Sequence, residues 1–137
     1  MRATAVAHPN IALVKYWGKA DVARNLPAVG SISITLDELV TTTTVEADPT
    51  LDDDVFALDG ASASDARTTR VRGCLEFVRE LRPGLPRVRV TSENSFPTAA
   101  GLASSASGFA ALVTAAGKGC GLNDLLRPER QTGLDAY

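Results

Sequence analysis

Small residues and serines dominate residues 94–108, which read Asn-Ser-Phe-Pro-Thr-Ala-Ala-Gly-Leu-Ala-Ser-Ser-Ala-Ser-Gly. The stretch joins a predicted strand at 87–91 to a predicted helix at 109–116. A loop without bulky side chains lets backbone approach a ligand closely, and the helix dipole and unpaired first N–H groups favour an anion there. Ser104 and Ser105 add hydroxyls for a phosphate oxygen or a magnesium ion. The pattern predicts a phosphate site, although the same small residues also suit close helix packing without a ligand.

A second polar cluster, Lys-Tyr-Trp-Gly-Lys at residues 15–19, follows a strand-like segment at 11–14. Lysines can hold a polyanionic ligand as point charges, and the Tyr16 hydroxyl can donate a hydrogen bond. On a regular strand the two lysines would share one face, unless Gly18 introduces a bend. Solvated lysines at an exposed strand end, beside one core tryptophan, would give the same pattern, so both interpretations stay open.

The remaining chain must supply the elements that position these two clusters. An apolar stripe of Val71, Leu75, Val78 and Leu81 predicts a helix over 63–82, with its arginines mostly on a solvated face. Alternation and β-propensity predict strands. These strands are expected at residues 3–8, 11–14, 31–36, 39–45, 55–58 and 87–91. Asp59-Gly60 is a hairpin-type turn, and the acidic run 48–54 is expected to be a solvated connection.

Together these elements predict an α+β fold with a mainly antiparallel sheet packed on helices. The three glycines at 117, 119 and 121 are expected to end the second helix at 116. The chain is therefore divided into a domain at 1–116 and a divergent tail at 117–137.

Composition narrows the possible functions. The 137 residues are 45% hydrophobic and 22% charged, as in a soluble globular protein, and a net charge of −2 gives no general attraction to nucleic acid. The uncharged run after Phe96 is too rich in Ser, Ala and Gly to span a membrane, and no signal peptide is evident. Cys74 and Cys120 form neither a metal motif nor a disulfide framework, which predicts a cytoplasmic location. The single histidine, His8, is expected to be structural or solvated rather than a base.

Three segments, 10–19, 31–36 and 94–108, closely resemble the mevalonate diphosphate decarboxylase family of the GHMP kinase superfamily. The Pro-x-x-x-Gly-Leu-x-Ser-Ser-Ala core is similar to the superfamily's phosphate loop, and Lys-Tyr-Trp-Gly-Lys narrows the resemblance to the decarboxylases. The resemblance covers residues 3 to about 116 and implies an incomplete GHMP kinase N-terminal domain, a fold also described as ribosomal protein S5 domain 2-like. Full-length relatives are implied to be homodimers.

The resemblance further implies an enzyme that uses ATP and Mg2+ to decarboxylate mevalonate 5-diphosphate to isopentenyl diphosphate. Lys15 would support the catalytic aspartate, and Asn10 would orient an arginine of the site. Substrate binding is assigned by position to Tyr16, Trp17, Gly18, Lys19 and Arg70. ATP binding is assigned to Pro97, Gly101, Leu102, Ala103, Ser104, Ser105 and Ala106, with Ser105 also offered to magnesium.

The sequence also departs from the family pattern. A Gly-Ser-Gly-Ser-Ala-Cys-Arg-type substrate segment and the catalytic aspartate, which the resemblance places after the phosphate-loop helix, have no match here. We therefore expect a truncation or a reading-frame change near residue 117, and little or no turnover by this chain alone. Two alternatives stay open: another GHMP kinase acting on mevalonate or its monophosphate, and a non-catalytic nucleotide-binding fragment.

Overall fold

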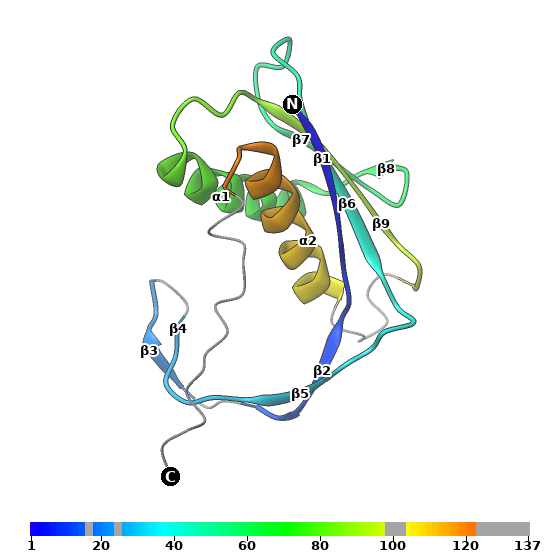
Figure 1. Ribbon diagram of the computed structural model, residues 1–137, viewed down its shortest axis with the longest axis vertical. Helices are drawn as coiled ribbons and strands as arrows, with labels where there is room; N and C mark the ends of the chain where they lie inside the picture. Colours follow the sequence, from blue (N-terminus) through cyan, green and yellow to red (C-terminus); the bar gives the residue numbers. More distant parts are fainter. Residues whose placement is uncertain (16–17, 24–25, 98–103, 123–137) are drawn as a thin grey trace.

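A computed structural model of the chain describes residues 1–15, 18–23, 26–97 and 104–122. Within them, a five-stranded sheet has the strand order β1-β6-β9-β7-β8 (Figure 1). The strands are β1 (Arg2–Ala7), β6 (Thr41–Ala47), β7 (Val55–Leu58), β8 (Ala61–Ser62) and β9 (Val88–Asn94). Neighbours are antiparallel except β7 and β9, which run parallel because α1 crosses between them. The predicted α+β class is thereby confirmed.

Two helices, α1 (Asp65–Leu81) and α2 (Ser104–Gly119), lie on the same side of this sheet (Figure 1). The core between the layers is built from alternate strand residues and the inward stripes of the helices. Its fully buried members include Val45, Val88, Val90, Leu75, Ala111 and Ala115. Because α2 meets the sheet largely through alanines, its backbone can lie close to β1 and β6.

An extended ribbon continues from one edge of the sheet. Strand β2 (Asn10–Val14) follows β1 and pairs antiparallel with β5 (Ile32–Thr35), which precedes β6. At the junction, the Leu36 amide donates to the Pro9 carbonyl at 2.9 Å, and His8 Nδ1 lies 3.0 Å from the Leu39 carbonyl oxygen. His8 is exposed and makes this contact, which fits the structural or solvated role expected of it. The ribbon bends at this junction and runs below the helices (Figure 1), towards the short pair β3 (Lys19–Asp21) and β4 (Leu26–Pro27).

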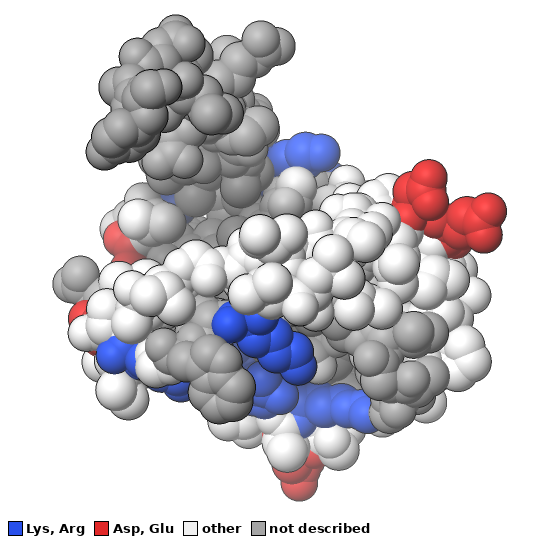
Figure 2. Space-filling model, turned by 90° about the horizontal axis from the view of Figure 1, so that it is seen from below, with Lys and Arg blue, Asp and Glu red and all other residues white. Residues whose placement is uncertain are grey.

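The two faces of the β2–β5 ribbon differ in character. Ile11 pairs with Ile34, and Val14 with Ile32, so these apolar side chains share one face. All four are exposed, Ile32 by 64% and Ile34 by 53%. Asn10, which precedes Ile11, and Ser33, which lies between Ile32 and Ile34, occupy the other face. Figure 2, which views the molecule from this lower side, shows basic side chains near the centre of the face and acidic ones at its margins.

Two features of the helices differ from the predictions. In α1, Leu81 is 64% exposed and is not part of the buried stripe, because the helix ends there before Pro83-Gly84. The second helix is longer than expected at both ends, since it begins at Ser104 and continues through Gly117, Lys118 and Gly119. Gly117 is buried, and a Cβ added to Gly119 would lie 2.9 Å from Met1 Sδ, so both glycines fit close packing, whereas Lys118 is exposed.

The glycine that ends α2 is Gly121, with a φ of +76°. The Leu122 amide donates to the Gly117 carbonyl at 2.8 Å, and the Gly121 amide donates to the Lys118 carbonyl at 3.1 Å. This pair of bonds is a Schellman motif, which satisfies the last helical carbonyls. Whether the chain divides into a domain and a tail at residue 117 stays a prediction. None of the described helices is long and apolar enough to cross a membrane.

Candidate functional site

The first turn of α2 lies between two hollows in the surface. One is a pocket of about 180 Å³ between α1, α2 and the sheet, where Ser104 and Ser105 line one wall and Arg67 and Arg70 the other. Phe56, Leu58, Val71 and Phe109 add an apolar portion to this pocket. Such a combination of donors, cations and apolar surface suits an anionic ligand with a flat or apolar part. We call it the helix pocket.

The second hollow lies on the polar face of the β2–β5 ribbon. Asn10, Lys15, Ser31 and Ser33 line it together with Ala106 of α2. Asn10 Nδ2 donates a hydrogen bond of 3.1 Å to Ser33 Oγ, which fixes the amide across the ribbon. Lys15, just beyond the end of β2, adds a positive charge. We call this hollow the ribbon pocket; it suits a small polar anion.

An interaction within the helix pocket orients Arg70. Its guanidinium carbon lies 5.5 Å from the centre of the Phe109 ring, a cation–π arrangement between α1 and α2. Stacking on a ring leaves the N–H groups around the edge of the guanidinium available to other acceptors. Arg67 lies three residues earlier on α1 and so on the same side of the helix. The two arginines can therefore act on one anion.

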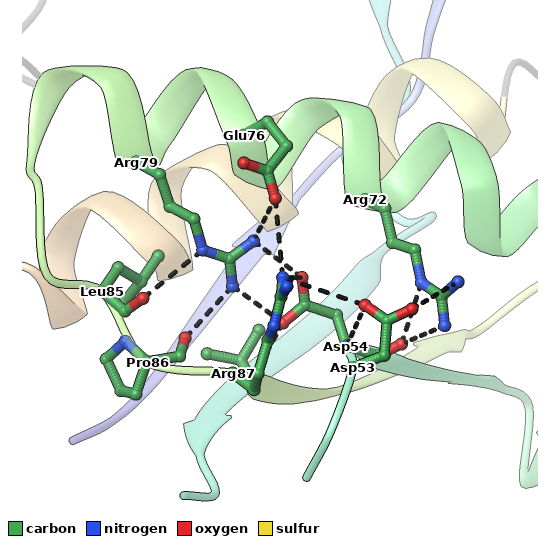
Figure 3. A network of polar contacts seen from close by, with 9 residues as sticks. Asp53, Asp54, Arg72, Glu76, Arg79, Leu85, Pro86 and Arg87 are labelled. Atoms are coloured by element: carbon green, nitrogen blue, oxygen red, sulfur yellow. Dashed lines mark hydrogen bonds and ion pairs between the residues drawn. The ribbon is translucent and has the colours of Figure 1, made fainter.

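The far end of α1 is held in place by a buried carboxylate. Asp54, before β7, is 1% exposed and accepts hydrogen bonds from Arg79 Nη1 at 2.7 Å, Arg79 Nη2 at 2.8 Å and the Val88 amide at 2.9 Å (Figure 3). Arg72 Nη2 donates to the Asp54 carbonyl at 2.8 Å and Nη1 lies 2.9 Å from Asp53 Oδ2. Glu76 also contacts Arg79, at 2.7 Å. The network joins α1 to β7 and β9 and so sets the position of the helix that carries Arg70.

This network corrects one prediction. The acidic run 48–54 is not simply a solvated connection, since Asp54 is buried. The arginines of α1 lie mostly on a solvated face as expected, and Arg79, which is 15% exposed, departs most from that pattern. Burial would raise the pKa of Asp54, but hydrogen bonds from Arg79 and Val88 outweigh it and hold the pKa below its ordinary value. Local sequence pattern did not indicate the pairing because its partners are 25 residues apart.

The structure brings together some of the predicted site residues and separates others. Ser104, Ser105 and Arg70 share the helix pocket, whereas Asn10, Lys15 and Ala106 share the ribbon pocket. Gly18 has a φ of +80°, so the bend considered for this segment is present, and Lys19 begins β3 beyond it as an exposed residue. Pro97 is exposed after β9. Tyr16, Trp17, Gly101, Leu102 and Ala103 lie outside the described residues.

Sequence reasoning missed Arg67 and the buried polar residues beneath α2, among them Thr41. The spacing of Arg67 and Arg70 was a usable signal, since residues three apart share a helix face.

Neither cysteine belongs to either pocket. Cys74 and Cys120 are half-buried against the core, and burial raises the pKa of both thiols, so they remain largely protonated. Among the described residues, no group of three or more His, Cys, Asp or Glu could hold a metal ion.

The described sheet, covered on one side by two helices, matches the N-terminal domain fold of the GHMP kinase superfamily. A sequence profile of the diphosphomevalonate decarboxylase-like N-terminal domain matches residues 7–131. The chain therefore belongs to the diphosphomevalonate decarboxylase-like family.

Individual relatives agree with this assignment. The chain is 44% identical to a phosphomevalonate decarboxylase of Haloferax volcanii, over 96% of this chain and 40% of the relative. It is 46% identical to a diphosphomevalonate decarboxylase of Candida albicans, over 85% of this chain and 35% of the relative. The chain thus spans about 40% or less of the length of these relatives.

Solved structures show the same relationship. A structure on the mevalonate diphosphate-mediated ATP-binding mechanism of the Enterococcus faecalis decarboxylase superposes with a TM-score of 0.83 at 47% identity, covering 89% of this chain and 38% of that one. A complex of MDDEF with MVAPP, AMPPCP and magnesium superposes with a TM-score of 0.82 at 47% identity, covering 89% and 37%.

Proposed function

We propose that this chain supplies the nucleotide-binding wall and part of the substrate site of an ATP-dependent decarboxylase of mevalonate 5-diphosphate. In that reaction ATP phosphorylates the 3-hydroxyl of the substrate; the phosphate and CO2 then leave together, giving isopentenyl diphosphate for isoprenoid biosynthesis. The protein contributes mainly by holding the reactants in place and stabilising charge. The names of the relatives support this assignment.

The observation that carries the proposal is the position of the first turn of α2 between the two pockets. Ser104 and Ser105 face the helix pocket and Ala106 lines the ribbon pocket. A nucleotide in the first pocket and a substrate in the second would meet at this turn. Phosphoryl transfer needs such a meeting point, where N–H groups and nearby cations can stabilise the charge of the transferred group.

Roles follow for the individual residues. Around the nucleotide phosphates we place Pro97, Gly101, Leu102, Ala103, Ser104, Ser105 and Ala106. Lys15 is proposed to lie near the reacting hydroxyl, and Asn10 to orient an arginine of the complete site. Tyr16, Trp17, Gly18 and Lys19 are proposed to hold the substrate, with Tyr16 and Lys19 at its diphosphate. Arg70 shares a pocket with Ser104 and Ser105, which favours contact with nucleotide phosphates over the substrate contact that the family resemblance implies.

A magnesium ion fits this arrangement through the nucleotide. Mg2+ takes few protein ligands and completes its coordination with phosphate oxygens and water, so the exposed Ser105 hydroxyl is a suitable donor even without a cluster of acidic residues among those described. When bound, the ion would neutralise charge on the phosphates.

Two measurements on the 137-residue chain test the proposal. Calorimetry with Mg·AMPPCP should show binding, and Ser105→Ala should weaken it. ADP release from Mg-ATP with mevalonate 5-diphosphate should be absent, since the family resemblance assigns none of these residues to the catalytic aspartate; a full-length relative serves as positive control. Absence of nucleotide binding would reject the proposed site, and turnover that disappears in Ser105→Ala would reject the expectation of inactivity.

A second candidate substrate is mevalonate 5-phosphate, since the Haloferax volcanii relative is named a phosphomevalonate decarboxylase. We favour the diphosphate because Lys19, with Tyr16, would add a donor and a charge for a second phosphate. Calorimetric titration of both compounds in the presence of Mg·AMPPCP separates the two. Tighter binding of the monophosphate would favour the alternative.

A homodimer is likewise proposed for the complete protein, and sedimentation velocity would test it.

A further inference from the structure

Three hydroxyl or amide side chains lie beneath the helix pocket and join α2 to the sheet. Thr41 on β6 donates from Oγ1 to Asn94 Oδ1 at 2.6 Å, which links β6 to the end of β9. Thr41 Oγ1 also lies 2.7 Å from Ser107 Oγ on α2. Ser107 Oγ in turn lies 3.2 Å from the carbonyl oxygen of Ser104. Because Thr41 gives its one proton to Asn94, Ser107 is the donor to Thr41 and shares its proton with the more distant Ser104 carbonyl. These contacts link the sheet to the first turn of α2.

These contacts are buried and directional. Thr41 and Ser107 are each 1% exposed. A buried hydroxyl that loses its partner is costly, so a shift of the helix relative to β6 would be opposed. The apolar contacts of Ala111, Leu112 and Ala115 further along α2 have no comparable directional preference. The polar contacts thus define where the first turn of α2 stands along the strand.

That first turn carries the groups that would bind phosphate. Ser104 and Ser105 line the helix pocket, and Thr41 lies at its base. We propose that Thr41 and Ser107 are positioning residues: they hold the first turn of α2 so that its hydroxyls and N–H groups meet a phosphate in the helix pocket. This inference rests on the proposed nucleotide site.

The test uses a substitution that removes the hydroxyl but keeps the side-chain volume. Thr41→Val should weaken the binding of Mg·AMPPCP about tenfold, while Thr41→Ser, which restores the hydroxyl, should bind within about twofold of the unmodified chain. Hydrogen exchange of the amides at 107–110 should become faster in Thr41→Val and not in Thr41→Ser. Amides near the end of α2 should be unaffected.

Thr43 offers a matched control. It is also 1% exposed on β6, and its hydroxyl lies 2.8 Å from Ser92 Oγ, but it does not contact α2 through this bond. Thr43→Val should lower stability by a similar amount and leave nucleotide affinity unchanged. Equal weakening in both Val variants, or unchanged affinity in Thr41→Val, would overturn the positioning role. If the unmodified chain does not bind nucleotide, the proposed nucleotide site is rejected. If hydrogen exchange at 107–110 is unchanged in Thr41→Val, the proposed positioning role of Thr41 is rejected.

Discussion

Asp54 receives both arms of the Arg79 guanidinium: Nη1 lies 2.7 Å from Oδ2, and Nη2 lies 2.8 Å from Oδ1. A two-point contact of this kind fixes direction as well as distance. Because Arg79 belongs to α1 and Asp54 precedes β7, the pair sets the orientation of the helix whose other half lines the helix pocket. A change at Asp54 is therefore expected to affect both the stability of the fold and the shape of the helix pocket.

Removing the negative charge of Asp54 should destabilise the fold. Asp54→Asn leaves the Arg79 guanidinium with only the exposed Glu76 carboxylate, among the described residues, as an ionic partner, and we expect the free energy of unfolding to fall by about 3 kcal/mol. Urea denaturation followed by circular dichroism measures the change. Asp53→Asn is the control, since Asp53 is 50% exposed and pairs with a 39% exposed Arg72, which predicts a loss of only about 0–1 kcal/mol. Equal losses in the two variants would contradict a dominant role for Asp54.

Acid should weaken the same contact. The pKa of Asp54 in the folded chain lies below its ordinary value of 3.8, so the unfolded chain binds the proton more tightly. The stabilisation is complete above the unfolded pKa and is lost as the pH falls through the folded pKa. We expect the stability difference between the unmodified chain and Asp54→Asn to narrow from pH 5 downward. The midpoints of urea unfolding, measured for both variants from pH 5 downward, test this prediction. A stability difference that does not change with pH would contradict the lowered pKa of Asp54.

Two glycines in different settings should respond oppositely to alanine. Gly121 has a φ of +76°, which is strained for alanine, so Gly121→Ala should destabilise the chain by about 1 kcal/mol. Gly73 is an exposed residue inside α1, and an added Cβ would meet no atom within 4 Å. Gly73→Ala should stabilise the chain by about 0.5–1 kcal/mol, because glycine loses more backbone freedom in a helix. Thermal melts of both variants check the opposite signs.

The two pockets should be separable by mutation. Lys15→Met removes a cation from the ribbon pocket. It should weaken the binding of mevalonate 5-diphosphate about tenfold and leave the binding of Mg·AMPPCP unchanged. Arg70→Met removes a cation from the helix pocket and should show the reverse pattern. Calorimetry with each ligand alone provides the four values. Loss of substrate affinity in Arg70→Met, with unchanged nucleotide affinity, would restore the role implied by the family resemblance.

Local pattern predicted several elements well. The strand at 55–58 matches β7, and the Asp59-Gly60 turn has positive φ at both residues. The helix expected at 63–82 is α1 within two residues at each end. Pattern failed where tertiary contacts decide: α2 continues through Gly117 because a small residue is buried there, and the Asp54–Arg79 pair joins distant segments.

The candidate site was predicted in parts rather than as an arrangement. Ser104, Ser105 and Lys15 were singled out by residue type and spacing, and the structure places them in two pockets that adjoin one turn of helix. Arg67 and Thr41 could not be assigned in the same way, since an arginine on a helix and a threonine in a strand have many uses. Their position follows from the packing of α1 and β6.

The order of strands has a consequence for synthesis of the chain. Strand β9 is last in sequence among the five strands but lies at the centre of the sheet, between β6 and β7. At roughly 5–20 residues per second, a ribosome takes a few seconds to advance from β8 to the end of β9. During that interval the inner edges of β6 and β7 have no native neighbour. A nascent chain that pauses within α1 would thus offer two open strand edges to chaperones or to other nascent chains.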